Sequence, residues 1–258
     1  MEIGKKKMII FDLDGTLTES KVSMDQEMTL IFSRLLNHWK VAVISGQGFP
    51  QFENQFLWHL NCPRESFKKL FLFPTNATRF YKHDSESWQE IYCEALSPDE
   101  KDKIFGSFEK AFVDVGYKHP EILYGEVIED RGTQITFSAL GQQAPLELKK
   151  KWKETEDRRA EIAATLRKYI PEFEVGVPGV TSIDVTRKGI DKGYGIEQIK
   201  KQFGYEISDL IFIGDALYEG GNDYPVKLLG VDCVPVAGPK ETQALLVKWL
   251  EEMEKVRV

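Results

Sequence analysis

Three short apolar runs, each followed at once by a polar or glycine residue, constrain the fold of this 258-residue chain more than any other feature. Residues 8–11, 41–44 and 210–213 are unbroken apolar stretches. A short apolar run without alternation is typical of a strand that is buried on both faces, as in a parallel sheet. An amphipathic helical pattern between the first two runs predicts a strand–helix–strand unit. Both ends of the chain are therefore predicted to form an α/β fold.

The middle of the chain has a different pattern of apolar and polar residues. Residues 133–137 and, more roughly, 180–185 alternate between apolar and polar side chains, which predicts antiparallel strands with one solvated face. Residues 146–169 predict one long charged helix, whose lysine, glutamate and arginine side chains we interpret as a solvated surface. We therefore expect an α+β domain inserted into the α/β core. The predicted boundaries give a core of 1–84 and 187–258 and an inserted domain of 85–186.

Composition excludes several classes of partner. The chain has 34 Lys and Arg against 41 Asp and Glu, a net charge of −7, which argues against non-specific binding of nucleic acid. Its apolar runs are too short for a membrane span or a signal peptide. Cys62, Cys93 and Cys233 form no CxxC motif and are typical of thiols in a reducing compartment. We expect a cytoplasmic protein with no nucleic-acid or membrane partner.

The residues that follow the first apolar run carry the clearest chemical signal. Asp12 and Asp14 are spaced i and i+2, and Gly15 and Thr16 come next. Ligands bind at the carboxyl ends of parallel strands, and this spacing directs both carboxylates to the same side of an extended chain. Two close carboxylates need a cation or a shared proton, and Mg²⁺ prefers oxygen ligands. Alone, the pattern would fit an Asp-Gly turn equally well.

Three further motifs follow in the chain. Ser45 and Gly46 end the second apolar run, Lys192 opens a predicted helix, and Asp215 and Asp223 come after a later run. Each motif by itself would fit an ordinary turn or an exposed lysine. Their order and their placement after apolar strands instead favour a single site at one edge of the sheet.

These motifs together resemble those of a known family. The set Asp12-x-Asp14-Gly15-Thr16, Ser45, Lys192 and Gly214-Asp215 to Asn222-Asp223 is similar to the four motifs of the haloacid dehalogenase (HAD) superfamily of phosphatases and phosphomutases. The long insertion is similar to the type II cap of Cof-like and sucrose-phosphatase-like members. The resemblance implies a Rossmann-like parallel-sheet core with an inserted α+β cap that closes over the site and selects the substrate.

The resemblance also implies roles for the motif residues. Asp12 would be the nucleophile that forms an aspartyl-phosphate, and Asp14 would be the general acid and then the general base. The phosphoryl oxygens would be bound by Thr16, Ser45, Gly46 and Lys192. A Mg²⁺ cofactor would be held by the Asp12 carboxylate, the Asp14 backbone carbonyl, Asp215 and Asp223.

A closer resemblance is to the eukaryotic-type phosphomannomutases. The residues of the cap that carry it are Arg131-Gly132-Thr133 followed by Phe137, and the strand Ser182-Ile183-Asp184-Val185 that leads to Gly189-x-Asp191-Lys192. These matches imply substrate contacts by Arg131, Ser182 and Asp184 and a homodimer formed through the cap.

The chain departs from the mutases at three places. Lys21 stands where they have an arginine, Ser138 follows Phe137 in place of another, and residues 139–145 contain none. Arginine grips a second phosphate by bidentate hydrogen bonds, so its loss favours hydrolysis over mutase chemistry.

The sequence therefore supports three functional hypotheses. The first is a Mg²⁺-dependent phosphohydrolase of small phosphorylated metabolites, with sugar phosphates as the expected class. The second is a phosphohexomutase of the phosphomannomutase kind, which shares every core residue. The third is a non-catalytic phosphosugar-binding protein on the same fold. Asp14 speaks against the third, because a binding protein has no need of a second carboxylate beside Asp12.

Overall fold

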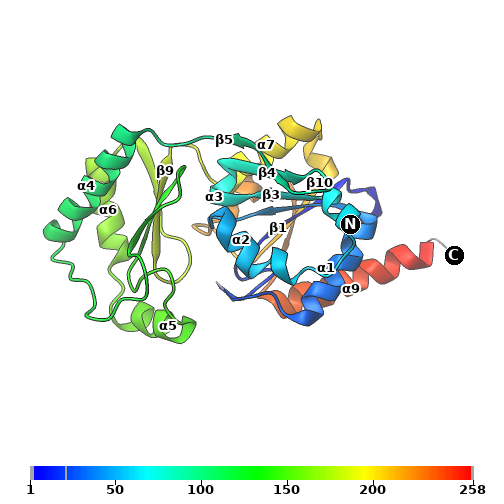
Figure 1. Cartoon of the computed structure of the whole chain (residues 1–258), viewed down its shortest axis with the longest axis horizontal. Helices are drawn as coiled ribbons and strands as arrows, with labels where there is room; N and C mark the ends of the chain where they lie inside the picture. Colours follow the sequence, from blue (N-terminus) through cyan, green and yellow to red (C-terminus); the bar gives the residue numbers. More distant parts are fainter. Residues whose placement is uncertain (1–2, 21, 257–258) are drawn as a thin grey trace. The chain divides into compact units, whose positions relative to one another are not determined.

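The computed structural model describes residues 3–20 and 22–256, which divide into two compact units (Figure 1). The core unit comprises Met1–Cys93 and Asp191–Val258, and the inserted unit comprises Glu94–Ile190. Lys21, which stands where the mutases have an arginine, lies outside the described residues.

The described part of the core unit is built on a seven-stranded sheet with the order β11-β10-β1-β2-β3-β4-β5. The first five strands in that order run parallel, and β4 and β5 are antiparallel additions at one edge. The strand bounds are β1 (Met8–Asp12), β2 (Lys40–Ile44), β3 (Leu70–Phe73), β4 (Arg79–His83), β5 (Trp88–Cys93), β10 (Leu210–Gly214) and β11 (Asp232–Pro235).

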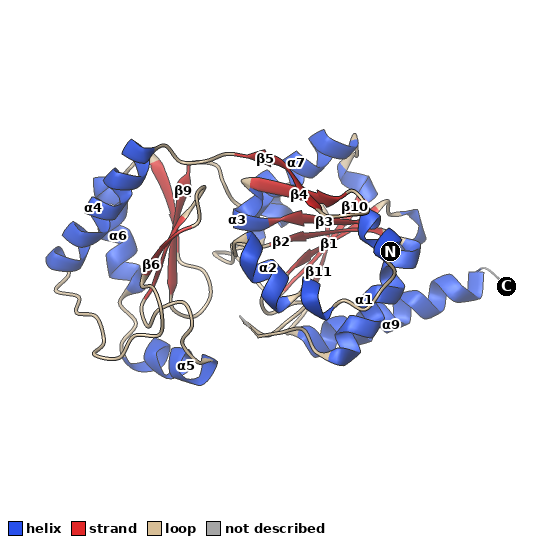
Figure 2. Cartoon of the chain, viewed as in Figure 1, coloured by secondary structure: helices blue, strands red, loops and turns tan. Residues whose placement is uncertain are grey.

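Alternate residues of the central strands enter two separate apolar clusters, one on each face of the sheet. Phe11 and Ile213 belong to the cluster that also contains residues of α1 (Gln26–His38) and α9 (Pro239–Val256). Ile10 and Phe212 belong to the cluster that contains residues of α7 (Lys192–Phe203). Figure 2 shows helices on both sides of the sheet. Burial on both faces explains why these runs carry no polar side chain.

A left-handed turn follows strand β3. Thr75, Asn76 and Ala77 have φ angles of 51°, 55° and 67°, although they fall within the short element α3 (Pro74–Ala77). Left-handed backbone costs about 1–2 kcal/mol for each residue that has a Cβ. The remaining elements of the core unit are η1 (Ile3–Lys5), α2 (Phe49–Gln55), η2 (Leu57–His59), η3 (Arg64–Lys69), η4 (Ile207–Asp209) and α8 (Tyr224–Leu228).

The described part of the inserted unit contains a four-stranded antiparallel sheet with the order β6-β7-β9-β8. Phe137 and Val185 point to one face, where they join an apolar cluster with residues of the helices. Thr136 and Asp184 alternate with them and form the opposite, polar face. The bounds are α4 (Pro98–Asp114), β6 (Ile128–Asp130), β7 (Ile135–Ser138), α5 (Leu146–Thr155), α6 (Arg159–Tyr169), β8 (Phe173–Gly176) and β9 (Ser182–Arg187).

Two details differ from the sequence expectations. The first boundary between the units lies after Cys93 rather than after residue 84, because β5 pairs with β4 and extends the core sheet; the second lies before Asp191 rather than 187. The expected single helix over 146–169 is two helices, α5 and α6. The break comes at Asp157, whose carboxylate accepts hydrogen bonds from the backbone and guanidinium of Arg159.

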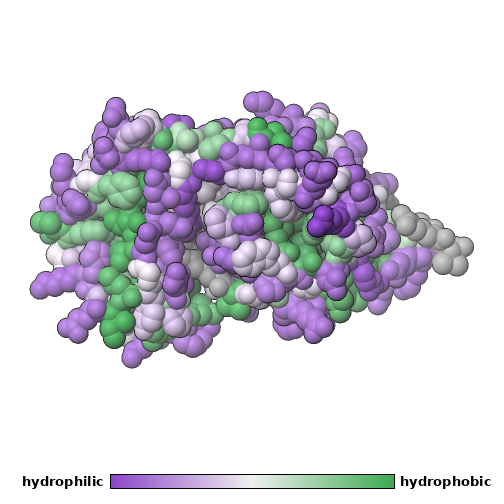
Figure 3. All heavy atoms as spheres, in the orientation of Figure 1, coloured by the Kyte–Doolittle hydropathy of each residue, from purple (hydrophilic) through white to green (hydrophobic). Residues whose placement is uncertain are grey.

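The surface of the chain carries mixed side chains. On the face drawn in Figure 3, hydrophilic residues predominate and apolar residues lie between them. The exposed apolar residues of the inserted unit include Val113 and Ile122. Across the described residues, no helix combines the length and the apolar character that a membrane crossing requires.

Candidate active site

Asp12 is the last residue of strand β1 and is almost fully buried. Its Oδ1 accepts a hydrogen bond of 2.7 Å from the backbone N–H of Leu13 and lies 2.7 Å from the Nζ of Lys192. Asp12 pairs in register with Ile44, the residue before Ser45, on the neighbouring strand β2. The carboxyl ends of these two parallel strands therefore bring the first two motifs together.

Lys192 is the first residue of helix α7 and is 1% exposed. Asp191 caps this helix by accepting a hydrogen bond from the Tyr194 N–H, which fixes where the helix begins. The Lys192 ammonium contacts Asp12 and also lies 2.5 Å from Oδ1 of Asp223, a fully buried carboxylate. Lys192, expected from its motif to belong to the site at the sheet edge, is thus the buried partner of two carboxylates.

Three carboxylates converge at this point. Among the described residues, Asp12, Asp215 and Asp223 each offer an oxygen, and the three oxygens lie within 4.8 Å of one another. Two glycines make room for them: a Cβ on Gly15, whose φ is +85°, would strike the Asp215 carboxylate, and one on Gly214 would strike that of Asp223. Three carboxylates beside one ammonium leave an excess of negative charge, which suits a divalent cation with oxygen ligands.

The electrostatics of the cluster follow from burial and mutual repulsion. Burial raises the pKa of Asp12 well above its usual value; Lys192 opposes this rise, while Asp223 and Asp215 add to it. Burial and the neighbouring Asp223 raise the pKa of Asp215. Burial lowers the pKa of Lys192, but the two adjacent carboxylates outweigh it and leave this pKa above its usual value. The carboxylates thus carry an unfavourable charge that a bound cation would relieve.

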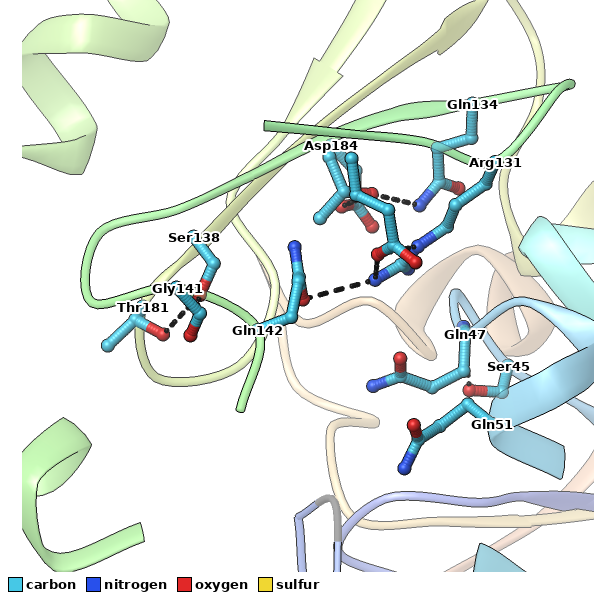
Figure 4. A network of polar contacts seen from close by, with 12 residues as sticks. Ser45, Gln47, Gln51, Arg131, Gln134, Ser138, Gly141, Gln142, Thr181 and Asp184 are labelled. Carbon is cyan, nitrogen blue, oxygen red and sulfur yellow. Dashed lines mark hydrogen bonds and ion pairs between the residues drawn. The ribbon is translucent and has the colours of Figure 1, made fainter. Parts of the chain in front are cut away.

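Ser45 and Thr16 are the buried hydroxyl residues of the first two motifs. The Ser45 Oγ accepts a hydrogen bond of 3.1 Å from the N–H of Gln47 (Figure 4). Thr16 is fully buried, and its Oγ1 has no hydrogen-bond partner among the described residues. A buried hydroxyl without a partner costs stability, so an added ligand oxygen would improve this site.

Two glutamines that the sequence analysis did not single out hold the Asp14 side chain. Gln55 Nε2 donates to Asp14 Oδ1 and Gln47 Nε2 donates to Asp14 Oδ2, both at 2.9 Å. Both glutamines are buried. Glutamine carries no signal of its own in a sequence, and these two lie 41 and 33 residues away from Asp14, so only the folded chain reveals the contact.

A pocket of about 210 Å³ opens beside Asp215 in the core unit. Cys233 lies in its wall, and burial raises the pKa of the Cys233 thiol to about 11. A thiol that stays protonated at neutral pH is a poor nucleophile. The pocket is lined by Asp215, Leu217, Tyr218, Lys227, Cys233 and Pro235.

Of the three expected cap residues, Arg131 and Asp184 lie in a network of polar contacts in the inserted unit (Figure 4). Arg131 pairs with Glu129 at 2.7 Å and donates to Gln142 at 3.4 Å. Asp184 accepts a hydrogen bond of 2.8 Å from Thr136. Ser182 begins strand β9 two residues before Asp184, so it shares that face of the sheet.

Ser138 and residues 139–145, where the mutases have arginines, make hydrogen bonds with neutral groups and with one buried lysine. Ser138 Oγ donates to the Gly141 carbonyl and lies 3.3 Å from the Thr181 hydroxyl. Lys149 was expected on a solvated helix with Lys150 and Lys151, but it is buried and its Nζ donates to the Gln142 carbonyl. The reason is the helical period, which turns Lys149, together with the buried Trp152, inward and leaves its two neighbours exposed.

The chain is similar in sequence to known proteins. The profile of a family described as haloacid dehalogenase-like hydrolase matches residues 9–225. The chain is 28% identical to a phosphomannomutase of Encephalitozoon cuniculi, over 94% of this chain and 93% of that protein. It is 26% identical to a phosphomannomutase of Schizosaccharomyces pombe, over 86% of this chain and 85% of that protein.

Solved structures share the fold. An IMP-nucleotidase of Plasmodium falciparum superposes with a TM-score of 0.70 at 17% sequence identity, over 96% of this chain and 69% of that chain. At this identity the likeness concerns the arrangement of the chain and leaves the substrate open.

Proposed function

This chain belongs to the haloacid dehalogenase-like hydrolase family, and from that premise we propose that it is a Mg²⁺-dependent phosphohydrolase of small phosphorylated metabolites, with sugar phosphates as the expected class. It is an enzyme of the phosphatase and phosphomannomutase kind. The observation that carries the proposal is the buried Asp12 carboxylate, 2.7 Å from the Lys192 ammonium and within 4.8 Å of two further carboxylates.

The residues present fit a magnesium ion. Asp12, Asp215 and Asp223 supply three converging oxygens, and the Asp14 backbone carbonyl is the fourth ligand that we propose. When bound, Mg²⁺ would neutralise negative charge on the oxygens of the transferring phosphoryl group.

Asp12 and Asp14 would divide the chemistry in two steps. An Asp12 carboxylate oxygen attacks phosphorus, the bond from phosphorus to the leaving oxygen breaks, and that oxygen takes a proton from Asp14. A water molecule then loses a proton to Asp14 and attacks the phosphorus of the aspartyl-phosphate. Inorganic phosphate leaves and the Asp12 carboxylate is restored.

The phosphoryl group needs donors of hydrogen bonds as well as charge. The Ser45 hydroxyl, the Gly46 N–H and the Lys192 ammonium would bind its oxygens. The buried Thr16 hydroxyl would gain a partner that the described chain does not give it. Phosphoryl transfer depends mostly on positioning and charge stabilisation, so this small set of groups is sufficient.

A second candidate function is supported by the relatives. The relatives named above are phosphomannomutases. The alternative is therefore a mutase, which moves the phosphoryl group from one position of a mannose phosphate to another. Hydrolysis is favoured by the inserted unit, where Arg131 already pairs with Glu129 and residues 139–145 contain no arginine. A mutase must grip a distal phosphate while the sugar turns, and the guanidinium group is best suited to that grip. We propose Arg131, Ser182 and Asp184 as contacts to the sugar, and a homodimer through the inserted unit.

One assay separates the two activities. The protein is incubated with mannose 1-phosphate or glucose 1-phosphate, Mg²⁺ and a hexose bisphosphate primer, and both free phosphate and the 6-phosphate are followed. We expect free phosphate to be the main product, because the aspartyl-phosphate should transfer its phosphoryl group to water faster than to a second sugar. If the 6-phosphate exceeded free phosphate by about tenfold, a difference of ~1.4 kcal/mol between the two transfer barriers, the protein would be a mutase and not a phosphatase.

A further inference from the structure

The left-handed turn of Thr75, Asn76 and Ala77 contacts two elements that carry proposed phosphate-binding groups. We propose that this turn positions the phosphate-binding site. It holds in place both the Ser45 loop (residues 45–47) and the first turn of helix α7, which carries Lys192. The inference rests on the proposed function, because it assigns the turn to the same phosphoryl group.

The contacts to the Ser45 loop are made by the backbone. The N–H of Asn76 donates to the carbonyl of Ser45, and the N–H of Thr75 donates to the carbonyl of Gln47, both at 2.9 Å. The Ser45 N–H in turn donates to the Phe73 carbonyl at 3.2 Å. Two successive N–H groups of the turn thus fix both ends of the loop, so the backbone conformation of the turn sets where the Ser45 hydroxyl lies.

The contact to helix α7 is made by packing. A Cβ built on Gly195 would lie 3.2 Å from the Cβ of Ala77, so the helix rests directly on the turn at this glycine. Gly195 comes three residues after Lys192, one helical turn along α7. The Tyr92 hydroxyl donates to the Ala77 carbonyl at 2.8 Å and ties the turn to strand β5.

The conformation of the turn is unusual for these residue types. A β-branched residue such as Thr75 at φ 51° is a rare outlier, and strained backbone persists only where its surroundings over-determine it. Here the surroundings include a hydrogen bond of 2.6 Å between the Thr75 and Thr78 hydroxyls and one of 2.8 Å from the Thr78 hydroxyl to the Thr75 carbonyl. An ordinary connection would use glycine at such positions. The cost of the strain is explained if the turn must present its two N–H groups to the Ser45 loop.

A pair of variants at one position tests the backbone conformation itself. Asn76→Gly and Asn76→Val both remove the amide side chain and keep the N–H, but glycine adopts φ 55° freely and valine resists it. The affinity for inorganic phosphate is measured by calorimetry in Mg²⁺, together with the melting temperature. We expect Asn76→Val to raise the Kd about tenfold or more and Asn76→Gly to leave it within about twofold. Thr29→Val, which removes a buried hydroxyl donor in helix α1, should lower stability and leave the Kd unchanged.

The remaining outcomes are decisive. An unchanged Kd in a destabilised Asn76→Val protein would show that the turn serves folding only, and an equal loss in both variants would assign the effect to the Asn76 side chain; either result overturns the inference. If Asn76→Val does not fold, Thr78→Val and Thr78→Ser replace the pair, and affinity must fall with valine and return with serine. A Ser45→Ala variant with unchanged phosphate affinity contradicts the proposed function itself and removes the premise of the inference.

Discussion

The charged cluster of the core unit and the polar network of the inserted unit differ in how well their polar groups are paired. In the core unit, three carboxylates gather around the ammonium of Lys192, and the buried Thr16 hydroxyl lacks a partner in the described chain. In the inserted unit, Arg131 pairs with Glu129, and Asp184 accepts from Thr136. The polar side chains of the inserted unit thus have partners within that unit, whereas the three carboxylates of the core unit leave a negative charge that favours a bound cation.

The two units also differ in what holds their polar groups in place. The core groups stand at the ends of strands β1 and β10 and at the start of helix α7, which are fixed by packing on both faces of the sheet. The polar groups of the inserted unit lie on strands β7 and β9 and in the loops beside β7, and they hold one another by side-chain hydrogen bonds. We therefore expect the core to supply the chemistry and the inserted unit to supply selectivity, and four experiments test that division.

The largest effect is expected from the same substitution made in both units. Asp12→Asn should keep the fold and lower kcat by about 10⁴-fold or more, because the amide cannot form the aspartyl-phosphate. Asp184→Asn should leave kcat within about tenfold, since the asparagine oxygen can still accept from Thr136. Steady-state kinetics on one phosphorylated substrate compares the two. An Asp12→Asn enzyme with more than about a tenth of the wild-type rate is incompatible with Asp12 as the nucleophile.

Removal of the metal should affect the core unit alone. Excess EDTA should abolish turnover and lower the melting temperature, because the carboxylates then repel one another without a cation. Ca²⁺ should restore the melting temperature but little turnover, because it is larger than Mg²⁺ and its coordination geometry is less strict. An Asp215→Asn variant should lose most of the thermal shift with Mg²⁺. Full activity in EDTA would exclude the proposed cofactor.

An intermediate effect is expected at the glutamine that holds Asp14. Gln55→Leu removes the donor to Asp14 Oδ1 and should lower kcat about 10–100-fold, because the acid–base carboxylate loses its fixed orientation. Gln243→Leu is the matched control: Gln243 is also buried and donates to both oxygens of Asp25, away from the cluster. Equal losses of kcat in the two variants would show that the glutamine acts on stability only.

The smallest effect concerns a charge pair inside the inserted unit. Hydrogen bonds from the Arg187 guanidinium and the Ser97 N–H lower the pKa of Glu100 from 4.5 to about 2. The stabilisation is therefore complete above pH 4.5 and is lost as the pH falls toward 2. Because the pair is partly exposed, we expect Glu100→Gln to cost only about 1 kcal/mol at neutral pH.

Urea unfolding at pH 7 and pH 3 measures this difference between wild type and Glu100→Gln. The gap in unfolding free energy should shrink at the lower pH, and kcat at neutral pH should not change. Glu172→Gln, which removes a partner of the exposed Lys103, is the control and should have little effect at either pH. A gap that grows at pH 3 would contradict the assigned pKa direction.

The convergence of the charged residues of the core could be predicted from the sequence, because each motif is local. Asp12 directly follows an apolar run and Asp215 follows the glycine that ends another, so their placement at the sheet edge depends only on the strands being parallel and buried. The predicted family is confirmed by the family profile, and the predicted α/β fold is confirmed by the structure. The division into a core and an insertion was also visible, as a change from unbroken apolar runs to alternating ones.

Which side chains pair at the site was decided by the tertiary structure. The burial of Lys192 between Asp12 and Asp223 depends on how helix α7 packs on the sheet, and the two glutamines on Asp14 come from a loop and a helix that carry no motif. The burial of Lys149 and the extra strand β5 are of the same kind. Periodicity reports which way a residue faces within its own element, whereas burial and pairing depend on contacts between distant segments, and these are set by the packing of the whole chain.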